Sequence, residues 1–243
     1  MNERLSFAIA GAQKCGTSAL DAYLRLHPEL AFGRHKESHF FDRETGIDWR
    51  NPDYELLHSS FGAPDGRMRG EATPVTLYWT PAQYRIARYK PDMRFIVLLR
   101  DPADRAFSQW RMSRRKGWES LPFSNAIREG RLRILNDGPR SLAARRFSYV
   151  ERGFYARQLT QLSEIFGWDQ IMIATQAELA TEPDSLLARV TDFLGVSRLE
   201  PVSVKRENIS PGDEQLTNDD RAYLNELYQE DLEALRSLTG LRI

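Results

Sequence analysis

The sequence predicts an α/β protein with a central parallel β-sheet flanked by helices. Short apolar runs typical of buried strands alternate with amphipathic helical segments, and that alternation favours a parallel sheet with helices on both faces. The first run, residues 7–10, leads into a glycine-bounded loop over 11–18 and then into a helix. Strand, glycine loop and helix follow each other in this order in phosphate-binding loops, so we expect a three-layer sandwich of the P-loop type.

The remaining helices and strands are predicted from the spacing of apolar residues and from residues that typically begin or end a helix. We expect strands or extended pieces at 29–32, within 69–74, at 94–99 and at 170–175. The run 94–99 is the best strand, because it is continuous, β-branched and aromatic, as in a central strand covered on both faces. We expect helices at 80–89, from 102 onward, at 149–166, 185–194 and 217–238, with a helical turn near 54–61, short helices within 116–148 and a polar loop over 203–213.

Capping residues mark several helix ends. Thr80 and Asp101 are predicted N-caps, each followed by a proline. Gly167 and Gly195 stop the helices that precede them.

Length and charge limit the kind of protein. The 243 residues suit a single domain, 1–243, with a sizeable core. Hydrophobic residues make up 41% and charged residues 28%, as in ordinary globular proteins. The 34 basic and 34 acidic residues balance, which argues against a general nucleic-acid binder but leaves room for a local basic cleft.

The single cysteine, Cys15, excludes an intramolecular disulfide and a multi-cysteine metal site. A reduced, cytoplasmic setting is the simpler expectation. No apolar run approaches the ~18–20 residues that span a bilayer, and no signal peptide is visible before the first strand, so we expect no membrane span.

The loop Gly11–Ser18 departs from the nucleotide triphosphatase pattern G-x-x-x-x-G-K-[ST] at one position. Both glycines are in register, but Thr17 stands where the lysine belongs and the lysine lies three residues earlier, at Lys14. Backbone N–H groups and the helix N-terminus can still hold an anion, and Thr17 and Ser18 add hydroxyl donors. The alternative is a turn in which the glycines serve only the backbone.

A second anion-binding candidate follows the strand 94–99. Arg100 closes that strand, and Ser108 lies about two turns into the next helix, so the two could clamp one phosphate. In the alternative, Arg100 pairs with Asp101 or Asp104 and Ser108 is solvated. Because ligands bind at the carboxyl ends of parallel strands, both candidates are expected at the same sheet edge.

Together these segments resemble the sulfotransferases that use 3′-phosphoadenosine 5′-phosphosulfate (PAPS), closest to the heparan-sulfate or glucosaminyl branch. The string GAQKCGTSAL is similar to their 5′-phosphosulfate loop, and RFIVLLRDPADRAFSQW to their 3′-phosphate motif. KESHFFD resembles E-x-H-F-F-D of that branch, and EATP resembles E-K-T-P. The four motifs occur in the expected order, between Phe7 and about Gly212.

The resemblance implies a sulfotransferase domain over 1–243, with PAPS as donor, PAP (adenosine 3′,5′-bisphosphate) as product and no metal. It implies donor contacts from the following residues: Gln13, Lys14, Cys15, Gly16, Thr17, Ser18, Arg100, Ser108, Lys205 and Arg206. Lys14 would stabilise the leaving group and Glu37 would act as base, in an in-line displacement. His39 could orient Glu37, act as the base itself, or be a structural histidine packed by Phe40.

One departure bears on the acceptor. Ala72 replaces the lysine that many relatives have in E-K-T-P, and Arg34, Lys36 or Arg43 are candidates to substitute for it. The resemblance implies a hydroxyl or amine acceptor on a carbohydrate, lipid or small metabolite, and it leaves the choice among them and the oligomeric state open. The alternatives are a P-loop phosphotransferase or nucleotide hydrolase, and a nucleotide-binding module without catalysis.

Overall fold

The computed structural model describes residues 4–63, 65–200 and 214–243. These residues form two compact units: one from residues before 100 and after 158 up to 200, the other from 100–158 and 214–243. The single domain expected over 1–243 stays a prediction.

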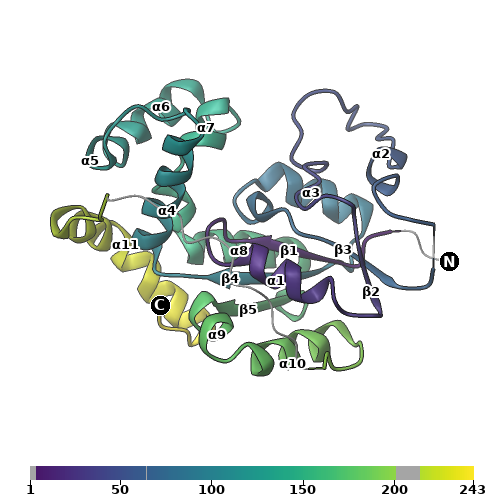
Figure 1. The fold of residues 1–243 in the computed structure, drawn as a ribbon. Helices are drawn as coiled ribbons and strands as arrows, with labels where there is room; N and C mark the ends of the chain where they lie inside the picture. Colours follow the sequence, from purple (N-terminus) through teal and green to yellow (C-terminus); the bar gives the residue numbers. More distant parts are fainter. Residues whose placement is uncertain (1–3, 64, 201–213) are drawn as a thin grey trace. The chain divides into compact units, whose positions relative to one another are not determined.

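The first unit is built on a five-stranded sheet, drawn as arrows in Figure 1. Its strands are β1 (Phe7–Gly11), β2 (Leu30–Phe32), β3 (Met68–Glu71), β4 (Arg94–Leu99) and β5 (Ile171–Thr175). They lie in the order β2-β3-β1-β4-β5, and every neighbouring pair is parallel. This confirms the predicted α/β class with a central parallel sheet.

Burial of the central strands shows that both faces of the sheet are covered. All five residues of β1 and the last five of β4 are buried, although successive side chains point to opposite faces. The helices of this unit flank the sheet in Figure 1. They are α1 (Thr17–Leu24), α2 (Glu55–His58), the 3-10 helix η1 (Pro74–Leu77), α3 (Thr80–Tyr89), the 3-10 helix η3 (Trp168–Gln170), α9 (Gln176–Thr181) and α10 (Pro183–Leu194).

The second unit is helical. It contains α4 (Pro102–Arg115), α5 (Phe123–Ala126), α6 (Glu129–Asp137), α7 (Leu142–Phe147), the 3-10 helix η2 (Glu151–Gly153) and α11 (Asn218–Thr239). The boundary between the units falls within α8 (Tyr155–Phe166). The buried core of the second unit joins α4 to α11 through Trp110, Phe123, Leu224 and Tyr228. Aromatic edge-to-face contacts, such as Trp110 with Phe123, add to the apolar burial.

The end signals are mostly confirmed. Asp101 is the N-cap of α4, where its carboxylate accepts from the Asp104 N–H at 2.8 Å. Gly195 ends α10 in the left-handed conformation. The prediction of Thr80 as an N-cap is wrong: α3 begins at Thr80 and Trp79 takes the cap position, so no side chain caps that helix.

Two further element predictions need correction. The helix expected at 149–166 begins at Tyr155, because residues 151–153 form a separate 3-10 turn. Helix α9 was not predicted, although Thr175 and Glu178 form the reciprocal capping box that announces it. The polar loop expected at 203–213 lies outside the described residues.

The sheet positions two segments at one edge. Parallel neighbours β1 and β3 present their carboxyl ends together, so the loop after Gly11 and the chain after Glu71 leave from adjacent strands. Gly70 permits this pairing, because a Cβ there would overlap the Phe7 ring. No helix of the described ranges is both long and apolar enough to cross a membrane.

Candidate active site

The glycine loop leaves β1 with a tightly fixed backbone. The Ala12 N–H donates to the Leu98 carbonyl at 2.8 Å, which ties the loop to β4, and the Cys15 N–H donates to the Ala12 carbonyl at 3.2 Å. Lys14 has φ 72° and Gly16 φ 89°, so the chain turns through the left-handed region twice within three residues. Glycine adopts that region without cost, whereas lysine does not.

The loop ends at the N-terminus of α1, and that end has no capping side chain. Gly16 is the N-cap residue, and Thr17 and Ser18 occupy the first two helical positions, whose N–H groups have no acceptor within a helix. Thr17 is buried and Ser18 is exposed, while Gln13 and Lys14 are half-buried and Cys15 is fully buried. Backbone donors, the helix dipole and Lys14 together fit a phosphate or sulfate.

The second part of the site is the segment 34–43, which has no helix or strand. Its Glu37 and His39 have φ 63° and 49°, again in the left-handed region. The Glu37 N–H donates to the Ala72 carbonyl at 3.1 Å, so the segment is attached just after β3. Because β3 lies beside β1, Glu37 is attached next to the strand from which the anion loop departs.

Four side chains of this segment form a chain of opposite charges. The Lys36 ammonium lies 3.0 Å from Glu37 Oε1, and His39 Nε2 lies 3.3 Å from Glu37 Oε2. On its other side, His39 Nδ1 lies 3.1 Å from Asp42 Oδ2. Asp42 is buried, whereas half of the His39 side chain is exposed. His39 is therefore held between two carboxylates.

These contacts fix the charges. Burial acts to raise the pKa of Glu37, but the hydrogen bond from His39 and the charge of Lys36 outweigh it and lower the pKa to about 2. Hydrogen bonds to Asp42 and Glu37 raise the pKa of His39 to about 9, against the effect of burial. At neutral pH Glu37 is thus an anion and His39 a cation.

Glu37 and His39 lie together in the structure, but not in the way that their spacing of two in the sequence suggests. A spacing of two would put both side chains on one side of an extended segment, but the backbone is left-handed at both residues. Asp42, which ends the KESHFFD string, was not among the predicted site residues, although its spacing of three from His39 indicates that the two can meet. Of the three cations considered in place of the missing lysine, the structure brings Lys36 against Glu37.

The other two cations have different contacts. Arg43 Nε donates to the His39 carbonyl at 3.2 Å, and Arg34 is exposed. Ala72 itself is buried, and its carbonyl is the acceptor for Glu37.

Arg100 and Ser108 belong to the second unit. Arg100 lies 3.5 Å from Asp104, which also pairs with Arg221 at 2.5 Å. Ser108 is half-buried one turn after Asp104 on α4. The arginine is therefore engaged with a carboxylate, as in the alternative reading of the sequence. Lys205 and Arg206, the other predicted donor contacts, lie outside the described residues.

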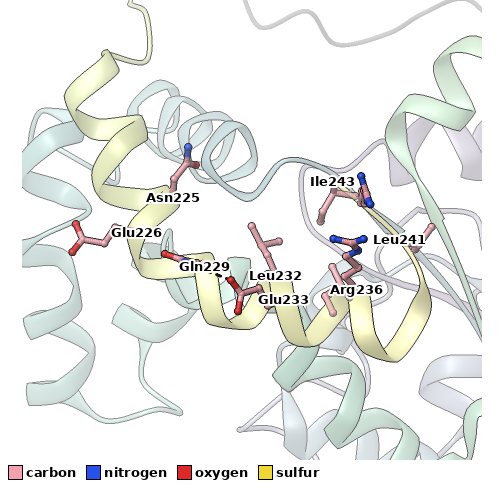
Figure 2. A pocket seen from close by; sticks show the side chains of 10 residues that line it. Asn225, Glu226, Gln229, Leu232, Glu233, Arg236, Leu241 and Ile243 are labelled. Atoms are coloured by element: carbon pink, nitrogen blue, oxygen red, sulfur yellow. Dashed lines mark hydrogen bonds between the residues drawn. The ribbon is translucent and has the colours of Figure 1, made fainter.

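A pocket of about 480 Å³ in the second unit contains none of the predicted site residues. Figure 2 shows it beside α11, with Leu232 and Leu241 among charged neighbours such as Glu233 and Arg236. Gln229 and Glu233, one turn apart, are hydrogen-bonded at 3.3 Å. This pocket contains no nucleophilic side chain and no anion-binding loop, so we place the candidate site at the sheet edge instead. Within the described part of the chain, no three His, Cys, Asp or Glu side chains group as metal ligands.

Comparison with known proteins gives a consistent result. The model of the sulfotransferase domain matches residues 6–233. Human heparan sulfate glucosamine 3-O-sulfotransferase 3B1 is 32% identical over 199 residues, which cover 79% of this chain and 46% of the relative. Human heparan sulfate glucosamine 3-O-sulfotransferase 6 is 34% identical over 199 residues, covering 79% and 52%. The chain spans about half the length of these curated relatives.

Solved structures agree on the fold. A sulfotransferase from Alicyclobacillus acidocaldarius superposes with a TM-score of 0.80 at 28% identity, covering 99% of this chain and 97% of that one. The sulfotransferase domain of the Synechococcus PCC 7002 olefin synthase superposes with a TM-score of 0.51 at 16% identity, covering 93% and 94%. The second likeness shows the fold alone.

Proposed function

Because the chain belongs to the sulfotransferase domain family, we propose that it transfers a sulfuryl group from PAPS to a hydroxyl of a carbohydrate acceptor. The carbohydrate is suggested by the relatives, whose names describe 3-O-sulfation of a glucosamine in heparan sulfate. An amine, a lipid or a small metabolite would be a different acceptor for the same chemistry. The cytoplasmic location expected from the single cysteine stays a prediction.

One observation supports this proposal most directly. Lys14, Glu37 and His39, the residues that the family resemblance assigns to catalysis, are the non-glycine residues with positive φ among those the structure describes. Such conformations cost about 1–3 kcal/mol each and cluster at active sites, where the surrounding structure enforces them. The strained backbone therefore falls on the same three residues that the sequence motifs indicate as catalytic, and a loop with a purely structural role would not require this.

We assign the donor to the loop and the uncapped end of α1. The N–H groups of Gly16, Thr17 and Ser18 would bind the 5′-phosphate, with Gln13 and Cys15 shaping the loop around it. Arg100 and Ser108 are proposed for the 3′-phosphate, on the family resemblance. For Arg100 this requires that the phosphate replace Asp104 as its partner. Lys205 and Arg206 are further proposed contacts.

The transfer breaks one S–O bond and forms another. The acceptor oxygen attacks sulfur, the bond from sulfur to the 5′-phosphate oxygen breaks, and PAP leaves with the electron pair of that bond. Lys14 would stabilise the negative charge that develops on the bridging oxygen. The acceptor proton goes to a base of the protein.

The charges of the segment favour Glu37 as that base. His39 carries a proton at neutral pH and cannot accept another, whereas Glu37 is ionised. A carboxylate with a pKa of about 2 accepts a proton poorly, so turnover requires that Lys36 or His39 move away from it. The sulfuryl group is anionic and would attract both cations. In this role Lys36 and His39 would take the place of the lysine that many relatives have where this chain has Ala72.

Ligand binding tests the donor. At 100-fold excess over its Kd, PAP should stabilise the protein by about 2.7 kcal/mol, which raises Tm by roughly 5–10 °C for a chain of this size. ATP with magnesium should raise Tm less, because Thr17 stands where a nucleotide triphosphatase has lysine. A larger shift with ATP and magnesium would contradict the sulfotransferase proposal and favour a phosphotransferase.

Turnover tests the catalytic roles. With labelled PAPS and a panel of carbohydrate, lipid and small-molecule acceptors, Lys14→Ala should abolish transfer. Glu37→Gln should keep PAP binding and lose at least about 100-fold in kcat. Unchanged kcat in Glu37→Gln would remove it as the base. Arg100→Ala should weaken PAP binding, and an unaltered affinity would exclude it from the donor site.

A further inference from the structure

Glu71 is a buried carboxylate that the proposed chemistry does not use. It is the last residue of β3 and only 6% exposed. Its Oε2 accepts a hydrogen bond from the Ser38 hydroxyl and another from Thr73 Oγ1 at 3.2 Å. Burial raises the pKa of Glu71, which both hydroxyls oppose. Burying a carboxylate costs free energy unless it is hydrogen-bonded. The two hydroxyl groups offset this cost, and the question is what the buried carboxylate does there.

Ser38 connects this carboxylate to the segment 34–43. It lies between Glu37 and His39, the two residues with left-handed backbone. Its hydroxyl donates to Glu71 and accepts from the Phe40 N–H at 3.3 Å. The neighbouring Glu37 N–H donates to the Ala72 carbonyl. Two consecutive residues of the segment are thus attached to two consecutive residues at the end of β3.

Such attachment is what a strained segment requires. Left-handed φ values at non-glycine residues persist only where several contacts enforce them. The segment 34–43 has no ladder of backbone hydrogen bonds of its own, so contacts to the sheet must supply the constraint. The Ser38–Glu71 bond spans 33 residues of sequence and fixes the point midway between Glu37 and His39.

We propose that Glu71 is a positioning residue. Through Ser38 it holds Glu37 and His39 in the left-handed backbone that brings their side chains together. The consequence for catalysis rests on the proposed function, whereas the consequence for the geometry of Glu37, His39 and Asp42 does not. The two can therefore be tested separately.

Thr73 provides the matched control. It donates to the same oxygen of Glu71 from the chain after β3, and among the described residues it makes no hydrogen bond to the segment 34–43. If Glu71 only stabilised the fold, Ser38→Ala and Thr73→Val would have the same consequences. If it positions the segment, the two variants should differ.

The first readout is the titration of the His39 ring by NMR, identified among the four histidines by its loss in His39→Gln. The charged groups around the ring are Lys36, Glu37, Asp42, Arg43 and Glu71. In wild type the ring should titrate near pH 9. In Ser38→Ala the midpoint should move by at least one pH unit toward 6.5, and in Thr73→Val it should stay.

The second readout is turnover. Ser38→Ala should lower kcat at least about tenfold at unchanged PAP affinity, and Thr73→Val should not. Glu71→Gln should lower kcat as well, and the double variant with Ser38→Ala should lose no more than the worse single variant, because both changes break one connection. Independent, multiplying losses would overturn the proposal.

Failure of the two proposals is distinguishable. If wild type transfers no sulfuryl group, the proposed function fails while the His39 titration still decides the positioning. An unchanged titration midpoint in both Ser38→Ala and Glu71→Gln, with near-wild-type Tm, overturns the positioning role. If Ser38→Ala unfolds, kcat in Glu71→Gln compared with kcat in Thr73→Val decides it, because loss of the Glu71 charge by itself also lowers the pKa of His39.

Discussion

At the scale of single residues, the site is governed by one histidine between two carboxylates. His39 contacts Glu37 with one ring nitrogen and Asp42 with the other, so both N–H groups of the charged ring have acceptors. A neutral ring has only one N–H and would leave one carboxylate without it. The segment therefore favours the charged form of His39, and its folding depends on pH.

We predict this dependence from the unfolding free energy of wild type and His39→Gln. The raised pKa of His39 stabilises the folded state fully below pH 6.5, and the stabilisation is lost as pH rises through about 9. Glutamine cannot gain the proton. The excess stability of wild type should thus be largest near pH 6 and decrease toward pH 9.5 in urea titrations. A difference that stays constant over this range would contradict the charged form.

At the scale of elements, the pairing of β1 with β3 decides whether the two parts of the site meet. Phe7 on β1 lies opposite Gly70 on β3, and the Phe7 ring covers the glycine. The same ring packs edge-on against Phe32, with the two ring centroids 5.4 Å apart. A larger residue at 70 has no room. The glycine is needed for this close approach, not for a special φ.

Gly70→Ala should therefore destabilise the protein by about 1–3 kcal/mol, because the added methyl group must displace the Phe7 ring or separate the strands. Gly62→Ala is the control, since a Cβ at Gly62 meets nothing within 4 Å. It should change stability by less than about 0.5 kcal/mol. Equal midpoints of denaturant unfolding for the two variants would show that β3 can shift away from β1.

At the scale of the whole molecule, the zero net charge hides an uneven distribution. Residues 100–148 contain twelve Lys and Arg against five Asp and Glu, a surplus of seven positive charges. Residues 44–67 contain two Arg against five Asp and Glu. A polyanion responds to local potential, so net neutrality does not prevent its binding.

We predict that the protein is retained on immobilised heparin near neutral pH and elutes with rising salt, because screening weakens the attraction. The double variant Arg115→Gln, Lys116→Gln removes two exposed charges from the basic segment and should elute at lower salt. Arg50→Gln, Arg67→Gln removes equal charge from the acidic segment and should elute like wild type. Equal shifts in both variants would mean that only net charge matters.

The sequence by itself determined the features that depend on neighbours along the chain. Apolar period gave the strands, Asp101 and Gly195 marked helix ends, and the spacing of Lys14 between two glycines indicated an anion loop of unusual charge placement. These signals are local, so propensity and spacing suffice to read them. The family motif also indicated Glu37 and His39 as a pair.

The tertiary structure alone decided how that pair is held and charged. The left-handed backbone at Glu37 and His39, the burial of Asp42 and the bond from Ser38 to Glu71 depend on β3 lying between β2 and β1. No local pattern encodes which strand inserts between two others, because that choice is made by packing across the sheet. For the same reason only the structure shows that Lys36 approaches Glu37, while Ala72 supplies a carbonyl in place of a cation.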